Sequence, residues 1–211
     1  MLFCSLAVTF ALAAFASGAA AASLVVKVMS PDGTPVSGAV VLLHGPPGWK
    51  TPPAAKFIVD QVNQTFTPDL TVMPVGSTVT FPNSDKVSHQ VYSFSPTMRF
   101  QLPLYRGTPY APITFANSGI VTLGCNIHDD MIAYLVITNA AWFGRTARDG
   151  SWSASDLPAG DFRIEVWHPR MREATGTVER ALKLEAAVSG RLDIRLMRSL
   201  RPEPLGQRPR S

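Results

Sequence analysis

The chain has 211 residues, of which 46% are hydrophobic and 16% are charged, and it contains 15 glycines and 18 prolines. This length suits one large domain or two small ones, and the composition favours a turn-rich β protein over a coiled coil or an acidic disordered chain. The net charge is +4, but residues 23–138 carry equal numbers of acidic and basic residues, so the whole surplus is C-terminal. Nucleic-acid binding needs several clustered basic residues that contact phosphates. Because this chain has a neutral body and only a mildly basic C-terminal part, we expect no nucleic-acid partner.

Residues 1–22 are predicted to be a signal peptide. They carry no charge, and an apolar stretch gives way to small residues, with Ala20 and Ala22 fitting an A-x-A cleavage site before Ser23. An uncleaved membrane anchor is the alternative, although the apolar run is short for one. We therefore expect a protein exported to the periplasm.

Cleavage would remove Cys4 and leave Cys125 as the single cysteine of the mature chain. In compartments outside the cytosol, thiols are oxidised or paired in disulfides, so an unpaired cysteine there must be protected or have a function. Metal ligation is the first explanation to test, and an inert buried thiol is the alternative.

Short strand-like segments follow one another along the mature chain. Two apolar strands at 24–28 and 39–43 flank a Pro-Asp-Gly turn, and residues 45–55 hold four prolines and are predicted to be a linker or exposed loop. No helix of ordinary length is predicted over residues 46–138, and a sandwich or barrel of about seven or eight strands is the economical interpretation. The expected strands of that region are 56–61, 71–73, 78–81, 90–93, 114–115, 120–124 and 132–138.

After residue 138 the pattern of turns changes. Strands are predicted at 151–155 and 162–167, joined by the turn Leu-Pro-Ala-Gly-Asp. Residues 175–184 and 191–197 are consistent with two more strands, although 179–187 would also suit a helix. The basic, proline-containing tail at 199–211 is predicted to be disordered.

The two flanks together resemble the carboxypeptidase regulatory-like, or transthyretin-like, β-sandwich. The resemblance rests on KVMSPDGTPVSGAVVLL at 27–43 and TARDGSWSASDLPAGDFRIEVWHP at 146–169. It implies a sandwich made of residues 23–45 plus 139–198, into which residues 46–138 are inserted.

Four residues with metal-binding side chains stand out: His89, Cys125, His128 and Met131. Three of them form a C-x-x-H-x-x-M string in a loop between two predicted strands. A mononuclear copper site uses a thiolate and two imidazoles in a plane with a weak thioether on the axis. The short loop can supply the thiolate, one imidazole and the thioether, so His89 must supply the second imidazole. Met131 as an ordinary core residue is the alternative.

Residues 56–138 resemble the cupredoxins, most closely the plastocyanin-like and amicyanin-like proteins often labelled methylamine utilisation proteins. The resemblance rests on F-x-N-x-D…H from Phe81 to His89, F-x-x-x-G-x-V-x-L-x-C from Phe115 to Cys125, and the H-x-x-M that follows. It implies an all-β, Greek-key β-sandwich or barrel, inserted into or joined to the second small β-sandwich. It also implies one type 1 copper ion.

In this resemblance His89, Cys125 and His128 are equatorial ligands and Met131 is axial. Many cupredoxins have an asparagine after the first histidine, whereas this chain has Gln90. Asn83 and Asn126 are the candidates to brace the ligand loop in its place.

The leading hypothesis is an exported electron carrier that exchanges single electrons with a redox partner protein, a cytochrome or an oxidoreductase, with His128 as the exit route. We expect no small-molecule substrate and no enzymatic activity. The alternatives are a copper-binding or delivery protein, a thiol enzyme with Cys125 as nucleophile, and a zinc site completed by Asp129 or Asp130. The other histidines, His44 and His168, are expected to be structural or exposed.

Overall fold

The computed structural model describes residues 21–173 and 176–202, and these residues form 17 β-strands. None of the described residues is helical, which confirms the all-β prediction. No helix in this part of the chain has the length and hydrophobicity to cross a membrane. Most of the predicted signal peptide, residues 1–20, lies outside the described residues, as does most of the predicted tail.

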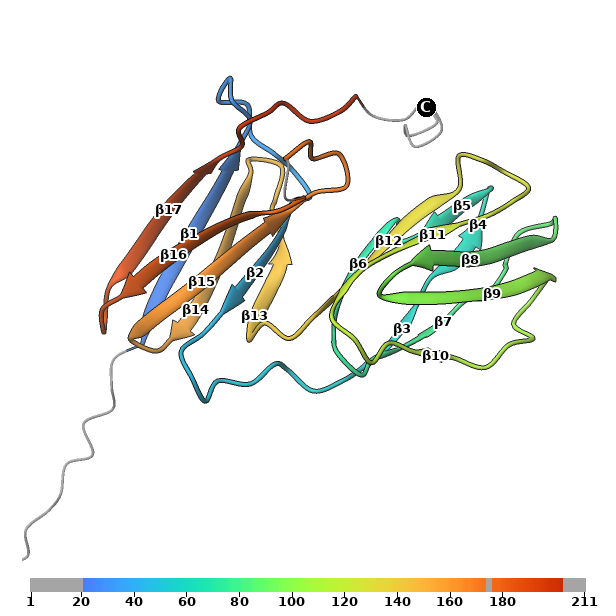
Figure 1. Ribbon diagram of the computed structural model, residues 1–211, viewed down its shortest axis with the longest axis horizontal. Helices are drawn as coiled ribbons and strands as arrows, with labels where there is room; N and C mark the ends of the chain where they lie inside the picture. The colour runs from blue at the N-terminus through green and yellow to red at the C-terminus, as the bar shows by residue number, and fades with distance from the viewer. Residues whose placement is uncertain (1–20, 174–175, 203–211) are drawn as a thin grey trace, which may run out of the picture.

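The first of two sandwiches is built from the two ends of the described chain (Figure 1). One sheet has the strand order β14-β1-β17 and the other has the order β13-β2-β15-β16. Strand β1 pairs with β14 in antiparallel fashion and with β17 in parallel fashion. The strands are β1 (Ala22–Met29), β2 (Val40–His44), β13 (Trp142–Arg145), β14 (Ser151–Leu157), β15 (Gly160–Trp167), β16 (Val178–Leu184) and β17 (Ser189–Arg195).

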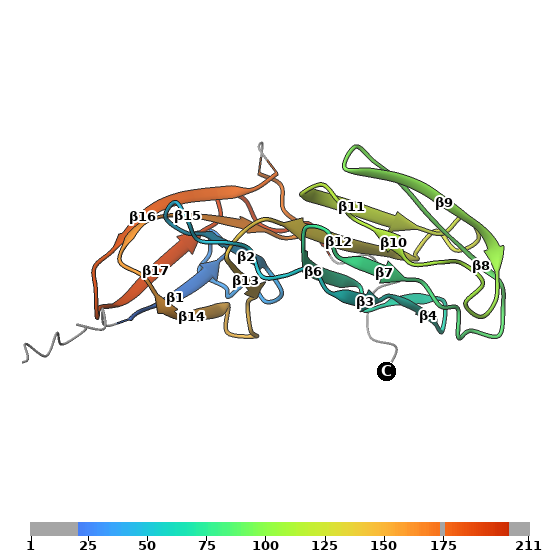
Figure 2. The same ribbon diagram turned by 90° about the horizontal axis from the view of Figure 1, so that it is seen from below.

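The second sandwich contains all strands between β2 and β13, and the two sandwiches lie side by side along the long axis (Figures 1 and 2). Its larger sheet has the order β6-β12-β11-β8-β9, its smaller sheet the order β10-β7-β3, and β4 and β5 form a hairpin. The strands are β3 (Lys56–Ile58), β4 (Asp60–Val62), β5 (Thr65–Thr67), β6 (Leu70–Pro74), β7 (Thr78–Thr80), β8 (His89–Ser95), β9 (Met98–Tyr105), β10 (Ile113–Thr114), β11 (Gly119–Gly124) and β12 (Ile132–Thr138).

Each sandwich has its own apolar core, as alternation along the strands predicts. In the first, alternate residues of β1 such as Leu24 and Val26 are buried against both sheets. In the second, Val121 and Leu123 of β11 meet Val79 of the smaller sheet. Burial of these apolar side chains is the main source of stability in each unit.

A third apolar cluster joins the two sandwiches. Strand β2 is buried on both faces, because Val41 and Leu43 enter the first core while Val40 and Leu42 face the second sandwich. Trp167 packs edge-on against Tyr134 of β12, with ring centroids 5.4 Å apart. The outer face of the larger sheet is therefore covered, at its β6–β12 side, by the first sandwich. The cluster consists of Val40, Leu42, Leu70, Val136, Ala140 and Trp167.

The structure decides one alternative and corrects one prediction. Residues 178–184 form β16, so the helix considered for 179–187 does not form, and ten strands rather than seven or eight lie between β2 and β13. At the start of the predicted tail, Leu200 packs against the first core, and the Arg201 N–H donates to the Arg170 carbonyl at 2.9 Å.

His168 lies at the junction of the sandwiches and is 8% exposed. It lines a cleft of about 270 Å³ together with Leu70, Tyr134 and Arg145. Burial, with the positive charges of Arg170 and Arg145, lowers the pKa of His168 to about 4. The folded protein therefore holds this imidazole neutral well below the pH at which it would protonate in the unfolded chain.

We predict a stability loss at acid pH that depends on His168. Because the folded pKa of about 4 lies below the unfolded value of 6.5, the unfolded state binds the extra proton between these values. The contribution of His168 to the free energy of unfolding is fully present above pH 6.5 and decreases by about 3 kcal/mol as the pH falls toward 4. His168→Gln should flatten the urea-unfolding free energy against pH in this window. Equal slopes for both proteins would contradict the prediction.

Candidate metal centre

Pairing of β8 with β11 brings two of the sequence-predicted ligands together. His89 is the first residue of β8, and Cys125 follows the last residue of β11. The two strands are antiparallel neighbours, with Gly124 opposite Tyr92, so the start of one meets the end of the other. A side chain at position 124 would collide with the Tyr92 ring, since its Cβ would lie 2.7 Å from Cζ. Glycine at this position therefore leaves room for the Tyr92 ring beside the β11 backbone.

Three predicted ligands converge at that end of the sandwich. The ligand atoms of His89, Cys125 and His128 all lie within 4.8 Å of one another. The Cys125 Sγ is 4.0 Å from His89 Nδ1, and the two imidazole centroids are 5.0 Å apart at an interplanar angle of 60°. His89 is fully buried, Cys125 is 3% exposed, and His128 is partly buried.

The other predicted ligand lies beside this group. Met131 is 1% exposed, and its N–H donates to the His128 carbonyl at 2.9 Å, which closes the loop between Cys125 and β12. Met131 and Cys125 line the same groove. Asp129 and Asp130, the residues considered as a fourth ligand for zinc, are exposed on the loop.

The donor set fits a metal ion. Bonds of about 2.0–2.3 Å from one ion place its ligand atoms about 3.5–3.8 Å apart, close to the 4.0 Å between Cys125 Sγ and His89 Nδ1. The Nδ1 of His128 is buried and has no hydrogen-bond partner among the described residues. A buried polar nitrogen without a partner is costly, and a metal ion would satisfy it. Thiolate and imidazole together suit copper and zinc.

The carboxylate of Asp85, to which the sequence analysis gave no role, contacts His89 on the side opposite Cys125. The Nε2 of His89 lies 3.0 Å from Asp85 Oδ2. The hydrogen bond to His89 and the backbone N–H groups of Gln64 and Lys86 hold the pKa of Asp85 low, at about 2. Because the ionised carboxylate only accepts, the imidazole donates from Nε2, and in the neutral ring Nδ1 then carries the lone pair, on the side of Cys125 Sγ.

The loop that carries Asp85 is braced by Asn83, one of the two asparagines proposed from the sequence for this task. The Asn83 side chain donates to the carbonyls of Val87 at 3.0 Å and Tyr105 at 2.7 Å, and accepts the Asp85 N–H at 3.0 Å. Asn126 is exposed. Asp85 and His89 are four positions apart, a spacing that implies contact in a helix but not in a loop, so the F-x-N-x-D…H motif contained both residues without predicting their contact.

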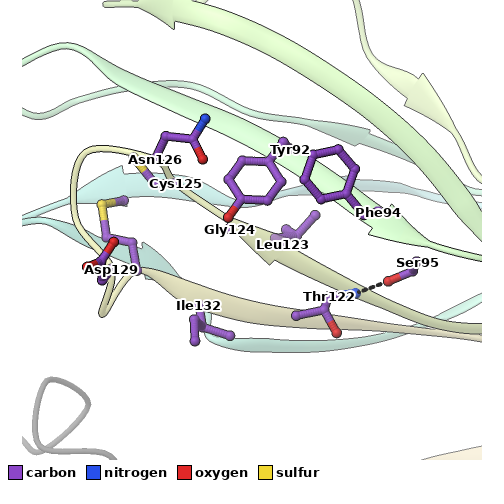
Figure 3. A pocket seen from close by; sticks show the side chains of 11 residues that line it. Tyr92, Phe94, Ser95, Thr122, Leu123, Gly124, Cys125, Asn126, Asp129 and Ile132 are labelled. Carbon is purple, nitrogen blue, oxygen red and sulfur yellow. Dashed lines mark hydrogen bonds between the residues drawn. The ribbon is translucent and has the colours of Figure 1, made fainter.

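An open groove of about 520 Å³ runs from Cys125 across the outer face of the larger sheet (Figure 3). The aromatic rings of Tyr92 and Phe94 lie next to each other along it, with centroids 5.0 Å apart. Ser95 accepts the Thr122 N–H at 2.9 Å at its far end. This is the part of the sheet face that the first sandwich leaves uncovered.

No protein-family model matches this sequence, and a comparison with curated proteins finds no match. Among solved structures, the chain is similar to a purple cupredoxin from Nitrosopumilus maritimus (19% identity, 38% of this chain and 98% of that one, TM-score 0.34). It is also similar to a copper-containing nitrite reductase from Thermus scotoductus (24%, 39% and 22%, TM-score 0.37) and to a variant of amicyanin (21%, 39% and 81%, TM-score 0.36). All three TM-scores are below 0.5, and we draw no functional conclusion from them.

The hairpin that contacts Asp85 provides a stability prediction. Asn63 and Gln64 form the two-residue turn between β4 and β5 with φ of 52° and 60°, and both side chains are exposed. Such turns favour glycine at the second position, because a Cβ is strained there. Gln64→Gly should raise the free energy of unfolding by about 1 kcal/mol in urea titrations. The N–H to Asp85 is kept, so metal binding should be unchanged; a destabilised variant would contradict this account.

Proposed function

We propose that this chain is a cupredoxin-like electron carrier that binds one copper ion through His89, Cys125, His128 and Met131. The convergence of a cysteine sulfur and two imidazoles within 4.8 Å of one another, on a β framework, is the observation that supports it. The described residues bring no carboxylate into this group of ligand atoms, which favours copper over a zinc site completed by Asp129 or Asp130.

Bound copper would supply a one-electron couple between Cu(II) and Cu(I). The protein fixes the donors: Cys125 and His89 are held by the β8–β11 pairing, and His128 by the short loop before β12. Because His89, Cys125 and Met131 are almost fully buried, water has little access to them. Donors held in place and shielded from water move little when an electron arrives or leaves, which keeps the reorganisation small.

We further propose that the partner is another redox protein, a cytochrome or an oxidoreductase in the periplasm, reached after removal of the predicted signal peptide. His128 is the partly buried member of the group, and Ile127 beside it is 49% exposed. This edge offers a short path from the ligands to a docked protein. One electron enters and one leaves, and no bond is made or broken in the carrier.

The buried thiol argues against the thiol-enzyme alternative. A nucleophilic cysteine must be reached by its substrate, whereas Cys125 is 3% exposed and is enclosed by the second core. Copper delivery favours exposed and exchangeable ligands. Met131 is buried and His89 is fully buried, so copper exchange should be slow.

The first test is spectroscopic. The chain beginning at Ser23, loaded with Cu(II), should show an intense thiolate-to-copper charge-transfer band and a narrow copper hyperfine splitting in electron paramagnetic resonance. Cys125→Ser should lose both signals, because the thiolate is the donor of the transition. A colourless protein, or only the weak band of tetragonal copper, would refute the carrier. Rapid alkylation of Cys125 in the copper-loaded protein would favour the thiol enzyme instead.

The role of Met131 can be tested against a matched methionine. Met131 and Met73 are both fully buried in the core of the second sandwich, and we place only Met131 at the copper ion. Met131→Leu should shift the visible spectrum and the reduction potential, since the axial ligand tunes both. Met73→Leu should leave them unchanged at a similar cost in stability. Equal spectra for the two variants would make Met131 a core residue only.

A further inference from the structure

The imidazole of His89 lies between the carboxylate of Asp85 and the sulfur of Cys125. Its Nε2 lies 3.0 Å from Asp85 Oδ2, and its Nδ1 lies 4.0 Å from Cys125 Sγ. The side chain of His89 is 0% exposed and that of Asp85 is 14% exposed. The contact is therefore shielded from water, where a charge acts more strongly than at an open surface.

Asp85 is itself fixed by three further hydrogen bonds. Its Oδ2 accepts the Gln64 N–H at 2.8 Å, its Oδ1 accepts the Lys86 N–H at 2.8 Å, and its own N–H donates to Asn83 Oδ1 at 3.0 Å. The first of these donors comes from the β4–β5 turn and the others from the loop before β8. Two segments of the chain thus aim this carboxylate at His89.

We infer that Asp85 is a positioning residue for the copper centre, which sets both the tautomer of His89 and the reduction potential. This rests on the proposed function. By accepting from Nε2–H, Asp85 keeps the Nδ1 lone pair of His89 free for the metal ion. Its negative charge, one imidazole ring from the ligand atom, favours Cu(II) over Cu(I) and lowers the reduction potential.

The chain offers a matched control in Asp60. Its carboxylate accepts hydrogen bonds from Ser84 N at 3.2 Å and Ser84 Oγ at 2.8 Å, so it holds the same loop without contacting His89. Asp60→Asn and Asp85→Asn remove the same charge from neighbouring positions. Only Asp85→Asn removes a charge hydrogen-bonded to a ligand.

We expect Asp85→Asn to change the ratio of Cu(I) to Cu(II) affinity at least tenfold in favour of Cu(I). This corresponds to a rise of about 59 mV in reduction potential for a one-electron couple. Asp60→Asn should change the ratio less than threefold, and Asp85→Glu should restore part of the wild-type potential. An Asp85→Asn potential no higher than that of Asp60→Asn would overturn the charge effect.

A second measurement needs no copper and no variant. Nitrogen-15 NMR of copper-free wild-type protein should show His89 as the Nε2–H tautomer with a slowly exchanging proton. The Nδ1–H tautomer would overturn the positioning role, even if the copper spectra support the carrier. A copper-binding failure with His89 in the Nε2–H tautomer would refute the proposed function and the effect on potential, while the tautomer assignment would stand.

Discussion

The candidate site depends on the antiparallel pairing of β8 with β11. With Gly124 opposite Tyr92, this pairing brings the start of β8, which carries His89, to the end of β11, which Cys125 follows. Gly124 leaves space beside this pairing for the Tyr92 ring, which lies where a Cβ would be. The 4.0 Å approach of Cys125 Sγ to His89 Nδ1 follows from this backbone geometry, and the C-x-x-H-x-x-M loop then adds His128 and Met131 to the same end.

Hydrogen bonds from loops and turns fix the residues next to the strand ends that carry the site. Asn83 ties the loop before β8 to the carbonyls of Val87 and Tyr105, and the β4–β5 turn contributes a backbone N–H to Asp85. The candidate ligands therefore have an apolar core on one side and a hydrogen-bonded network of loop and turn residues on the other. Such a network fixes the direction of an imidazole more tightly than packing does, because hydrogen bonds are directional and cores are not.

The outer face of the larger sheet in the second sandwich has two different environments. Around Val136 and Tyr134 of β12 the outer face is covered by Val40 and Trp167 of the first sandwich. Around Tyr92, the same face is open as the groove beside Cys125. The first sandwich therefore covers the part of the face away from the groove and leaves the groove itself open.

The sequence by itself determined the β class, the order of the donor residues and the apolar alternation of most strands, because these are local properties of the chain. It also marked β2 as a continuous apolar run, but only the tertiary structure explained the run, since both faces of that strand are covered. The F-x-N-x-D…H motif contained Asp85, but its contact with His89 was likewise visible only in the tertiary structure. Its contact with His89 depends on how a loop and a distant turn fold together, and no spacing rule describes that contact. Residue types thus defined which chemistry is possible, and three-dimensional packing decided which atoms meet to perform it.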